Sequence, residues 1–369
     1  MKDAHIVLAD GTRFRGHAFG ADVTATGEAV FTTGMTGYEE VLTDPSYCGQ
    51  IVTMTAPQIG NTGINLEDGE ARRPALRAFV VRELSAITSN WRTVESLDAY
   101  LKKHGIPGIT GIDTRTLTRH IRDVGAQMAA VGTEDPATLH DHAKAAPPMT
   151  GQNLTGEVTT PEPFEWTEGS GVWGEAREDA RPWHVVAVDF GVKLNILRCL
   201  VDEGCKVTVV PATTSADDIL ALDPDGIFLS NGPGDPAAVA GGIQTVRDLI
   251  GKRPLFGICL GHQLMSLALG AETYKLKFGH RGLNQPVKDL KTGRIEITTQ
   301  NHGFCVDVDS LEGKCNVTHL HLNDDTCQGI EHVETGAFGV QYHPEAAAGP
   351  HDSRYLFRRF TDAIAEQRA

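Results

Sequence analysis

A short apolar segment in the second half of the chain leads straight into a cysteine flanked by glycines. Residues 254–256 read Pro-Leu-Phe, and Gly257, Cys259 and Gly261 follow with one residue between neighbours. This pattern predicts a buried strand that turns sharply into a helix at about 262–270, because glycine permits the close packing that such a turn needs. The thiol would stand at the positive end of the helix dipole, which favours the reactive thiolate. A free cysteine is more often a small buried apolar side chain, but the two glycines favour a nucleophile.

A histidine and a glutamate near the C-terminal end supply a base for such a nucleophile. Residues 339–342 predict a strand that stops at Pro344, which cannot donate to a sheet ladder. His343 and Glu345 are two residues apart, so we expect both side chains on one side of an extended segment. Glu345 would then hold one imidazole nitrogen while the other faces the thiol. His302 is an alternative base, but no carboxylate follows it two residues later.

A turn rich in glycine and proline forms the third part of this pattern. An apolar strand predicted at 226–230 runs into Gly232, Pro233 and Gly234. Gly234 has a backbone N–H and no side chain to block a ligand, whereas Pro233 has no N–H. The N–H groups of Gly234 and Leu260 are therefore candidates for an oxyanion hole. Taken alone, the segment would be an ordinary turn.

The composition of the chain excludes several classes of protein. The 369 residues are 40% hydrophobic and 22% charged, as expected for a globular protein of two or three domains. The formal net charge of −15 argues against nucleic-acid and anionic-membrane partners, since phosphate would be repelled. The sequence offers neither a signal peptide nor the ~20 apolar residues of a membrane span.

Cysteine usage indicates a reducing compartment. The seven cysteines form no Cys-x-x-Cys pair, and their odd number fits a cytoplasmic protein better than a disulfide framework. Cys315, His319, His321 and Cys327 lie near one another in the sequence, but their spacing matches no standard metal motif. We therefore expect no metal site in this chain.

Predicted strands and helices alternate in the second half of the chain, from residue 183 to residue 369. In order, they are 184–189, 192–203, 206–210, 216–222, 226–230, 237–250 and 255–258. This alternation indicates an α/β domain with a mostly parallel sheet that is covered by helices on both faces. Later segments are richer in strands, and a helix is predicted from about Ser353 to the C-terminus.

The first half has a different organisation. Residues 1–146 predict a smaller α+β domain, with a hairpin turn at Asp10-Gly11 and helices at 93–104 and 114–124. Residues 147–182 are rich in proline, glycine and acidic side chains, which is typical of a linker.

The three polar segments, in this order, resemble the class I glutamine amidotransferase family from Trp183 to the C-terminus. The resemblance implies a doubly wound α/β sheet that carries a glutaminase. It makes Cys259 the nucleophile, His343 the general base and acid, and Glu345 the orienting carboxylate.

Segments of the first half resemble one branch of that family, the small subunit of carbamoyl-phosphate synthetase. They are residues 34–50, 59–61 and 108–115, together with 188–193 and 349–352 in the second half. The resemblance implies hydrolysis of L-glutamine to glutamate and ammonia. The ammonia would pass through a tunnel to a large subunit, which makes carbamoyl phosphate from bicarbonate and two ATP for pyrimidine and arginine synthesis. The sequence has no phosphate-binding loop, so no cofactor is expected in this chain, and ATP and Mg belong to the large subunit of the heterodimer.

The same resemblance implies a set of glutamine-binding residues. These are Ser46, Gly232, Gly234, Leu260, Gln263, Asn301, Gly303 and Phe304. Taken alone, Ser46 could be a turn residue after Pro45, Gln263 an exposed helix residue, and the segment around Gly303 a hairpin turn. Three other functions stay open: the glutaminase component of another amidotransferase synthetase, a stand-alone cysteine hydrolase of γ-glutamyl compounds, and a non-enzymatic scaffold.

Overall fold

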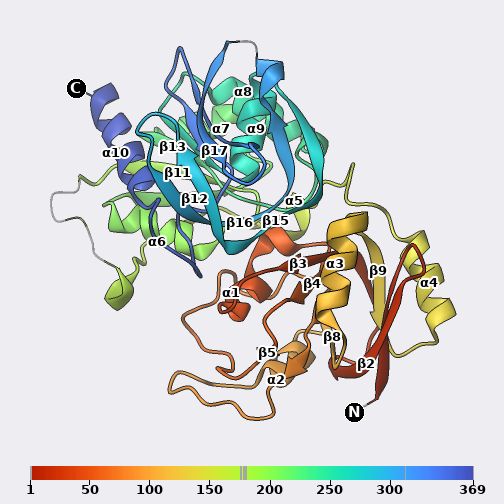
Figure 1. The fold of residues 1–369 in the computed structure, drawn as a ribbon. Helices are drawn as coiled ribbons and strands as arrows, with labels where there is room; N and C mark the ends of the chain where they lie inside the picture. The colour runs from red at the N-terminus through yellow and green to blue at the C-terminus, as the bar shows by residue number, and fades with distance from the viewer. Residues whose placement is uncertain (1, 175–176, 178–180, 312, 369) are drawn as a thin grey trace. The chain divides into compact units, whose positions relative to one another are not determined.

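The chain folds into two compact units. The computed structural model describes residues 2–174, 177, 181–311 and 313–368 (Figure 1). Unit 1 consists of Met1–Gln152 and Lys277–Gly282, and unit 2 of Asn153–Leu276 and Leu283–Ala369. Part of the predicted linker, residues 175–176 and 178–180, lies outside the described residues. The predicted domain boundaries at residues 146 and 183 stay predictions.

Unit 1 is built around a closed barrel with the strand order β1-β2-β8-β6-β4-β3-β9. Its strands are β1 (Asp3–Leu8), β2 (Arg13–Gly20), β3 (Ala25–Thr32), β4 (Gln50–Met54), β6 (Ala78–Val80), β8 (Pro107–Thr110) and β9 (Gln127–Gly132). Strands β5 (Gln58–Ile59) and β7 (Glu83–Leu84) pair separately. The predicted hairpin of β1 and β2 is present, whereas the closure of the sheet and strand β9 were not predicted. Closure depends on pairs such as β3 with β9, which are far apart in the sequence.

Four helices accompany the barrel. They are α1 (Tyr38–Thr43), α2 (Leu97–Lys103), α3 (Thr114–Val124) and α4 (Pro136–Ala145). Helix α3 has the predicted bounds because Asp113 caps it, its carboxylate accepting from the Thr116 N–H at 3.0 Å. The helix buries Leu117 and Ile121 among barrel side chains.

Unit 2 is built on a ten-stranded sheet with the order β10-β12-β11-β13-β14-β19-β18-β17-β15-β16. Its strands are β10 (Phe164–Trp166), β11 (His184–Asp189), β12 (Lys206–Pro211), β13 (Gly226–Leu229), β14 (Leu255–Ile258), β15 (Glu272–Asp289), β16 (Ile295–Asp307), β17 (Cys315–His321), β18 (Cys327–His332) and β19 (Phe338–Val340). The central strands from β12 to β19 pair in parallel, and antiparallel strands flank them. This arrangement confirms the predicted mostly parallel core.

Helices cover both faces of the sheet, as the alternation of strands and helices predicted. They are α5 (Thr155–Val158), α6 (Leu194–Asp202), α7 (Ala216–Ala221), α8 (Ala240–Leu249), α9 (Leu260–Ala268) and α10 (Tyr355–Arg368). Along β11, Val186 and Val188 join the core cluster that contains residues of α7, α8 and α9. Val185 and Ala187 face the other way and join the cluster that contains residues of α6 and α10. This alternation is the two-residue period of a strand buried on both faces.

Three strands differ from the sequence-based expectation. Strand β10 lies inside the predicted linker and pairs with β12 at the edge of the sheet. Strand β15 is 18 residues long, and its residues 277–282 belong to unit 1. Strand β16 continues through 301–304, where a hairpin turn was one reading of the sequence. No helix of the described chain is long and apolar enough to cross a membrane.

Phe256 provides a test of the packing that supports β14. Its ring is fully buried and lies 4.5 Å from the Phe338 ring and 5.4 Å from the Phe228 ring, between centroids. We expect Phe256→Ala to lower the free energy of unfolding of unit 2 by about 3–5 kcal/mol, because it leaves a cavity in the core. Chemical denaturation followed by circular dichroism would measure the loss. The exposed Val172→Ala is the control, and a loss below about 1 kcal/mol for Phe256→Ala would contradict the packing described here.

Candidate functional site

Cys259 occupies the turn between β14 and α9, as the glycine pattern predicted. Its backbone has φ 52° and ψ −104°, a conformation that L-residues seldom adopt. Two hydrogen bonds fix the turn: the Cys259 N–H donates to the Val340 carbonyl at 2.8 Å, and the Gly261 N–H donates to the Ser230 carbonyl at 3.0 Å. The thiol is 2% exposed and lies 3.8 Å from the Asn301 carbonyl oxygen.

The two glycines of the turn are required by backbone packing. A Cβ on Gly257 would lie 2.7 Å from the Gly261 carbonyl carbon. A Cβ on Gly261 would lie 2.3 Å from the Leu229 carbonyl oxygen at the end of β13. Neither position has room for a side chain, because these distances are far below van der Waals contact.

His343 and Glu345 are in contact, as their spacing predicted. His343 Nδ1 lies 2.7 Å from Glu345 Oε1, and both side chains are buried. The backbone at His343 differs from the prediction, because β19 ends at Val340. A turn follows the strand, and in this turn the Ala346 N–H donates to the His343 carbonyl. His343 Nε2 has no hydrogen-bond partner among the described residues. It is therefore the nitrogen available for the reacting groups.

Lys193 is a member of the site that the sequence reasoning missed. Its ammonium group is buried and donates to Glu345 Oε1 at 2.9 Å and to the Ala346 carbonyl at 2.7 Å. Asp189 holds the loop that carries it, because its carboxylate accepts from the N–H groups of Gly191 at 2.9 Å and Val192 at 2.7 Å. A lysine that follows a buried apolar strand so closely was the available signal, because such a charge needs a partner.

Charged neighbours set the protonation of Glu345 and His343. Burial alone would raise the pKa of Glu345, but Lys193 and His343 hold it well below its usual range. Burial alone would lower the pKa of His343, but the Glu345 carboxylate and the Cys259 sulfur raise it well above its usual range. The imidazole of His343 is thus held in its protonated form by Glu345.

His302 does not offer a free nitrogen. Its Nδ1 lies 2.8 Å from the Phe304 carbonyl and its Nε2 lies 3.0 Å from Gln300 Oε1. Both nitrogens are occupied within the protein, and the ring is buried. The geometry therefore favours His343 over His302 as the base.

Three of the predicted glutamine-binding residues lie close to Cys259. The Gln263 side chain is buried, not exposed, and its amide donates to the Phe304 carbonyl and to Gln341 Oε1, both at 2.9 Å. Asn301 presents its carbonyl to the thiol from β16. The bond between Gln263 and Phe304 thus ties helix α9, which follows Cys259, to β16.

The three glycines of the predicted set lie in different backbone environments. A Cβ on Gly232 would lie 2.3 Å from the Phe190 carbonyl oxygen and 2.8 Å from Leu260 Cδ2. Gly234 has φ 94° and forms an isolated bridge with Asn153. Gly303 lies inside strand β16. The Gly232 turn is therefore packed against the residue that follows Cys259.

Ser46 belongs to unit 1. It lies in the 3₁₀ turn Pro45–Tyr47, and its N–H donates to Asp44 Oδ1 at 2.9 Å. Asp44 thus caps this turn, and the Ser46 side chain is buried. Its role toward glutamine stays a prediction.

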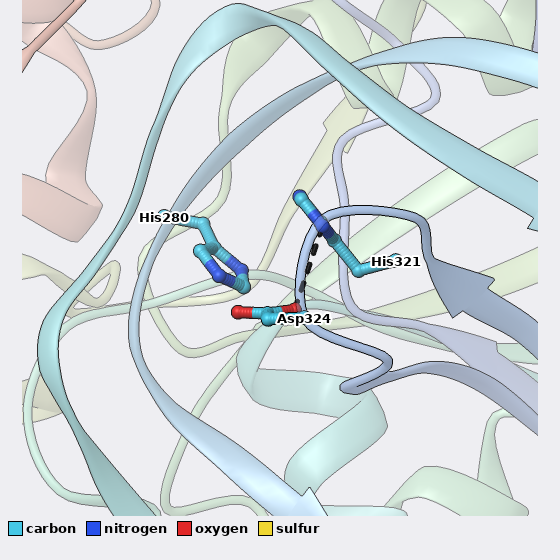
Figure 2. Close-up of side chains that lie close together, drawn as sticks. All are labelled: His280, His321 and Asp324. Atoms are coloured by element: carbon cyan, nitrogen blue, oxygen red, sulfur yellow. Dashed lines mark ion pairs between the residues drawn. The ribbon is translucent and has the colours of Figure 1, made fainter.

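Groups of potential metal ligands occur elsewhere in unit 2. His321 Nδ1 and Asp324 Oδ1 form an ion pair at 3.5 Å (Figure 2). Asp289, Glu296 and His319 form a buried group, but hydrogen bonds already engage them, such as Thr292 Oγ1 to Asp289 Oδ2 at 2.6 Å. No group of this kind among the described residues includes Cys315 or Cys327. None of the seven cysteines, all of which lie among the described residues, forms a disulfide.

Comparison with known proteins gives matches over both halves of the chain. Residues 186–363 match the family model "Glutamine amidotransferase class-I", and residues 6–131 match "Carbamoyl-phosphate synthase small chain, CPSase domain". The chain is 56% identical to the carbamoyl phosphate synthase small chain of Syntrophotalea carbinolica, over 99% of this chain and 98% of the relative. It is 58% identical to that of Thermosynechococcus vestitus, over 99% of this chain and 97% of the relative.

The protonation of His343 can be tested by removing its carboxylate partner. We expect Glu345→Gln to lower the pKa of His343 from well above the usual 6.5 to near or below it, because the carboxylate is lost and only the Cys259 sulfur then opposes burial. The imidazole would be protonated at pH 7.5 in the unsubstituted protein and neutral in the variant. Nitrogen-15 NMR of the histidine side chains between pH 5 and 9 would measure both states. Glu331→Gln, which removes only the partner of Arg359, is the control. A His343 that stays protonated at pH 7.5 in Glu345→Gln would contradict this account.

Proposed function

Because this chain belongs to the family of carbamoyl-phosphate synthase small chains, we propose that it hydrolyses L-glutamine and supplies the ammonia to a large subunit. The observation that carries the proposal is the buried contact of His343 with Glu345 beside the strained Cys259 turn. A nucleophile, a base with one free nitrogen and an orienting carboxylate are the parts that acyl transfer needs.

In the proposed reaction, the Cys259 sulfur attacks the side-chain amide carbon of glutamine. The C=O π electrons move to oxygen, and the N–H groups of Leu260 and Gly234 stabilise the oxyanion that forms. The C–N bond then breaks, and His343 Nε2 gives its proton to the departing ammonia. Water attacks the resulting thioester after losing a proton to His343, which releases glutamate and restores the thiolate. Glu345 holds the imidazole in the required orientation throughout.

The remaining polar residues are proposed to bind the ends of glutamine. Ser46, Gly232, Gln263, Asn301, Gly303 and Phe304 complete this set. The burial of Gln263 and its bonds to Phe304 and Gln341 support a positioning role, since they hold the wall of the site in one arrangement.

The chemistry beyond ammonia release is assigned to the partner. In this proposal the large subunit receives ammonia through a tunnel and uses ATP and Mg to make carbamoyl phosphate, and this chain needs no cofactor or metal. The product would enter pyrimidine and arginine synthesis in the cytoplasm. The match of residues 6–131 to the synthase-specific domain favours this function over the glutaminase of another synthetase.

The nucleophile can be tested in the assembled enzyme. We expect Cys259→Ser to reduce carbamoyl phosphate formation from glutamine by at least about 10³-fold and to leave formation from free ammonia unchanged. The hydroxyl is a far weaker nucleophile than the thiolate, while the large subunit is not altered. Cys315→Ser is the matched control. Loss of both activities in a folded complex, or of neither, would refute the assignment.

The base can be tested separately from the nucleophile. We expect His343→Asn to slow thioester formation by about 10²–10⁴-fold, because asparagine cannot transfer the proton. Rapid-quench trapping of labelled glutamine on the protein would measure the rate. Normal turnover in His343→Asn would instead assign the base to His302.

A further inference from the structure

An arginine-lined pocket lies on unit 1, apart from the residues proposed for glutamine chemistry. Its volume is about 440 Å³, and it is lined by Thr33, Thr55, Arg115, Thr118, Arg119 and Arg122. The three arginines lie on α3 at positions i, i+4 and i+7, so they share one face of the helix. The opposite face buries Leu117 and Ile121 in the core of unit 1.

The positive charge of this face is largely uncompensated. Within the part of the chain that the structure describes, neither Arg115 nor Arg119 forms an ion pair with a carboxylate. Only Arg122 is paired, through Nε to Asp123 Oδ1 at 2.8 Å. This concentration of exposed guanidinium groups stands out in a chain whose net charge is −15. An anionic ligand is therefore expected there, because guanidinium groups bind carboxylate and phosphate oxygens in pairs.

The spacing of the arginines favours an extended ligand. Seven residues of α-helix span about 10 Å, so the backbone positions of the three arginines form a row of about that length along α3. Several carboxylates along a polypeptide segment would match it.

The surroundings have the composition of a protein interface. Met35, two residues beyond Thr33, is 84% exposed, and Val124 at the end of α3 is 56% exposed. Methionine and arginine are enriched in the cores of protein interfaces. The Thr118 hydroxyl in the pocket wall is buried and has no hydrogen-bond partner among the described residues.

We infer that Arg115, Arg119 and Arg122 form a docking site for an acidic segment of the large subunit. The inference rests on the proposed function, which supplies that partner. It adds the surface of this chain that the partner contacts and the charge that the partner presents.

The test uses the full chain and the purified large subunit of the same enzyme. We expect Arg115→Gln/Arg119→Gln/Arg122→Gln to weaken association about tenfold or more, since exposed pairs each contribute a modest amount. The dependence of the dissociation constant on salt should also become shallower, because fewer ion pairs form. Glutamine hydrolysis by the isolated chain should be unchanged, and circular dichroism should show an intact fold.

A second triple variant controls for the loss of three positive charges. Arg13, Lys102 and Lys103 are also exposed residues of unit 1, and their replacement by glutamine should leave association unchanged. Equal weakening by both triple variants, or unchanged binding by the first, would overturn the inference. Binding of inorganic phosphate to the three arginines, measured by calorimetry, would also overturn it if the bound phosphate prevented association with the large subunit. Failure of the unsubstituted chain to bind the large subunit at all would instead refute the proposed function.

Discussion

The site in unit 2 depends on how closely the backbone of the Cys259 turn approaches its neighbours. Gly257 and Gly261 meet each other and the end of β13, while a Cβ on Gly339 would lie 2.9 Å from the Gly257 carbonyl oxygen. Holding a non-glycine residue in the conformation of Cys259 costs about 1–3 kcal/mol, and it persists because the surrounding structure leaves no alternative. The Cys259 N–H bonds to Val340, three residues before His343. The strained turn and His343 are therefore positioned by the same strand pair.

A second constraint is the burial of charge. Glu345 is fully buried, and a carboxylate in that position is tolerated only with partners of opposite charge. Lys193 supplies one of them from the loop after β11, and His343 supplies the other from the turn after β19 that also carries Glu345. Removing Glu345 would leave the two buried positive groups without the carboxylate that they share. Through Glu345, the loop after β11 thus contributes to the protonation of His343, although no described bond joins that loop to the Cys259 thiol.

Sequence reasoning succeeded where local chemistry determines structure. Glycine requirements predicted the Cys259 turn, and α3 has the bounds that were predicted for it. It failed where a strand or a side chain depends on a partner that lies far away in the sequence. The barrel closes through β3 and β9, and β10 is a strand because β12 leaves an open edge for Phe164–Trp166. Lys193 was missed for the same reason, since its partner Glu345 lies 152 residues away.

The charged groups discussed in the two units differ in their burial and therefore in how strongly salt screens them. The charges around Glu345 are buried, so salt screens them little, and they act on protonation. The arginines of α3 are exposed, so salt screens them strongly, and they act on encounter with a partner.

A partner that changes the rate of glutamine hydrolysis must bind two states of this chain with different affinity. Exposed ion pairs that are identical in both states cannot supply that difference. Activation by the large subunit would therefore require a contact that differs between the states, in addition to docking on α3.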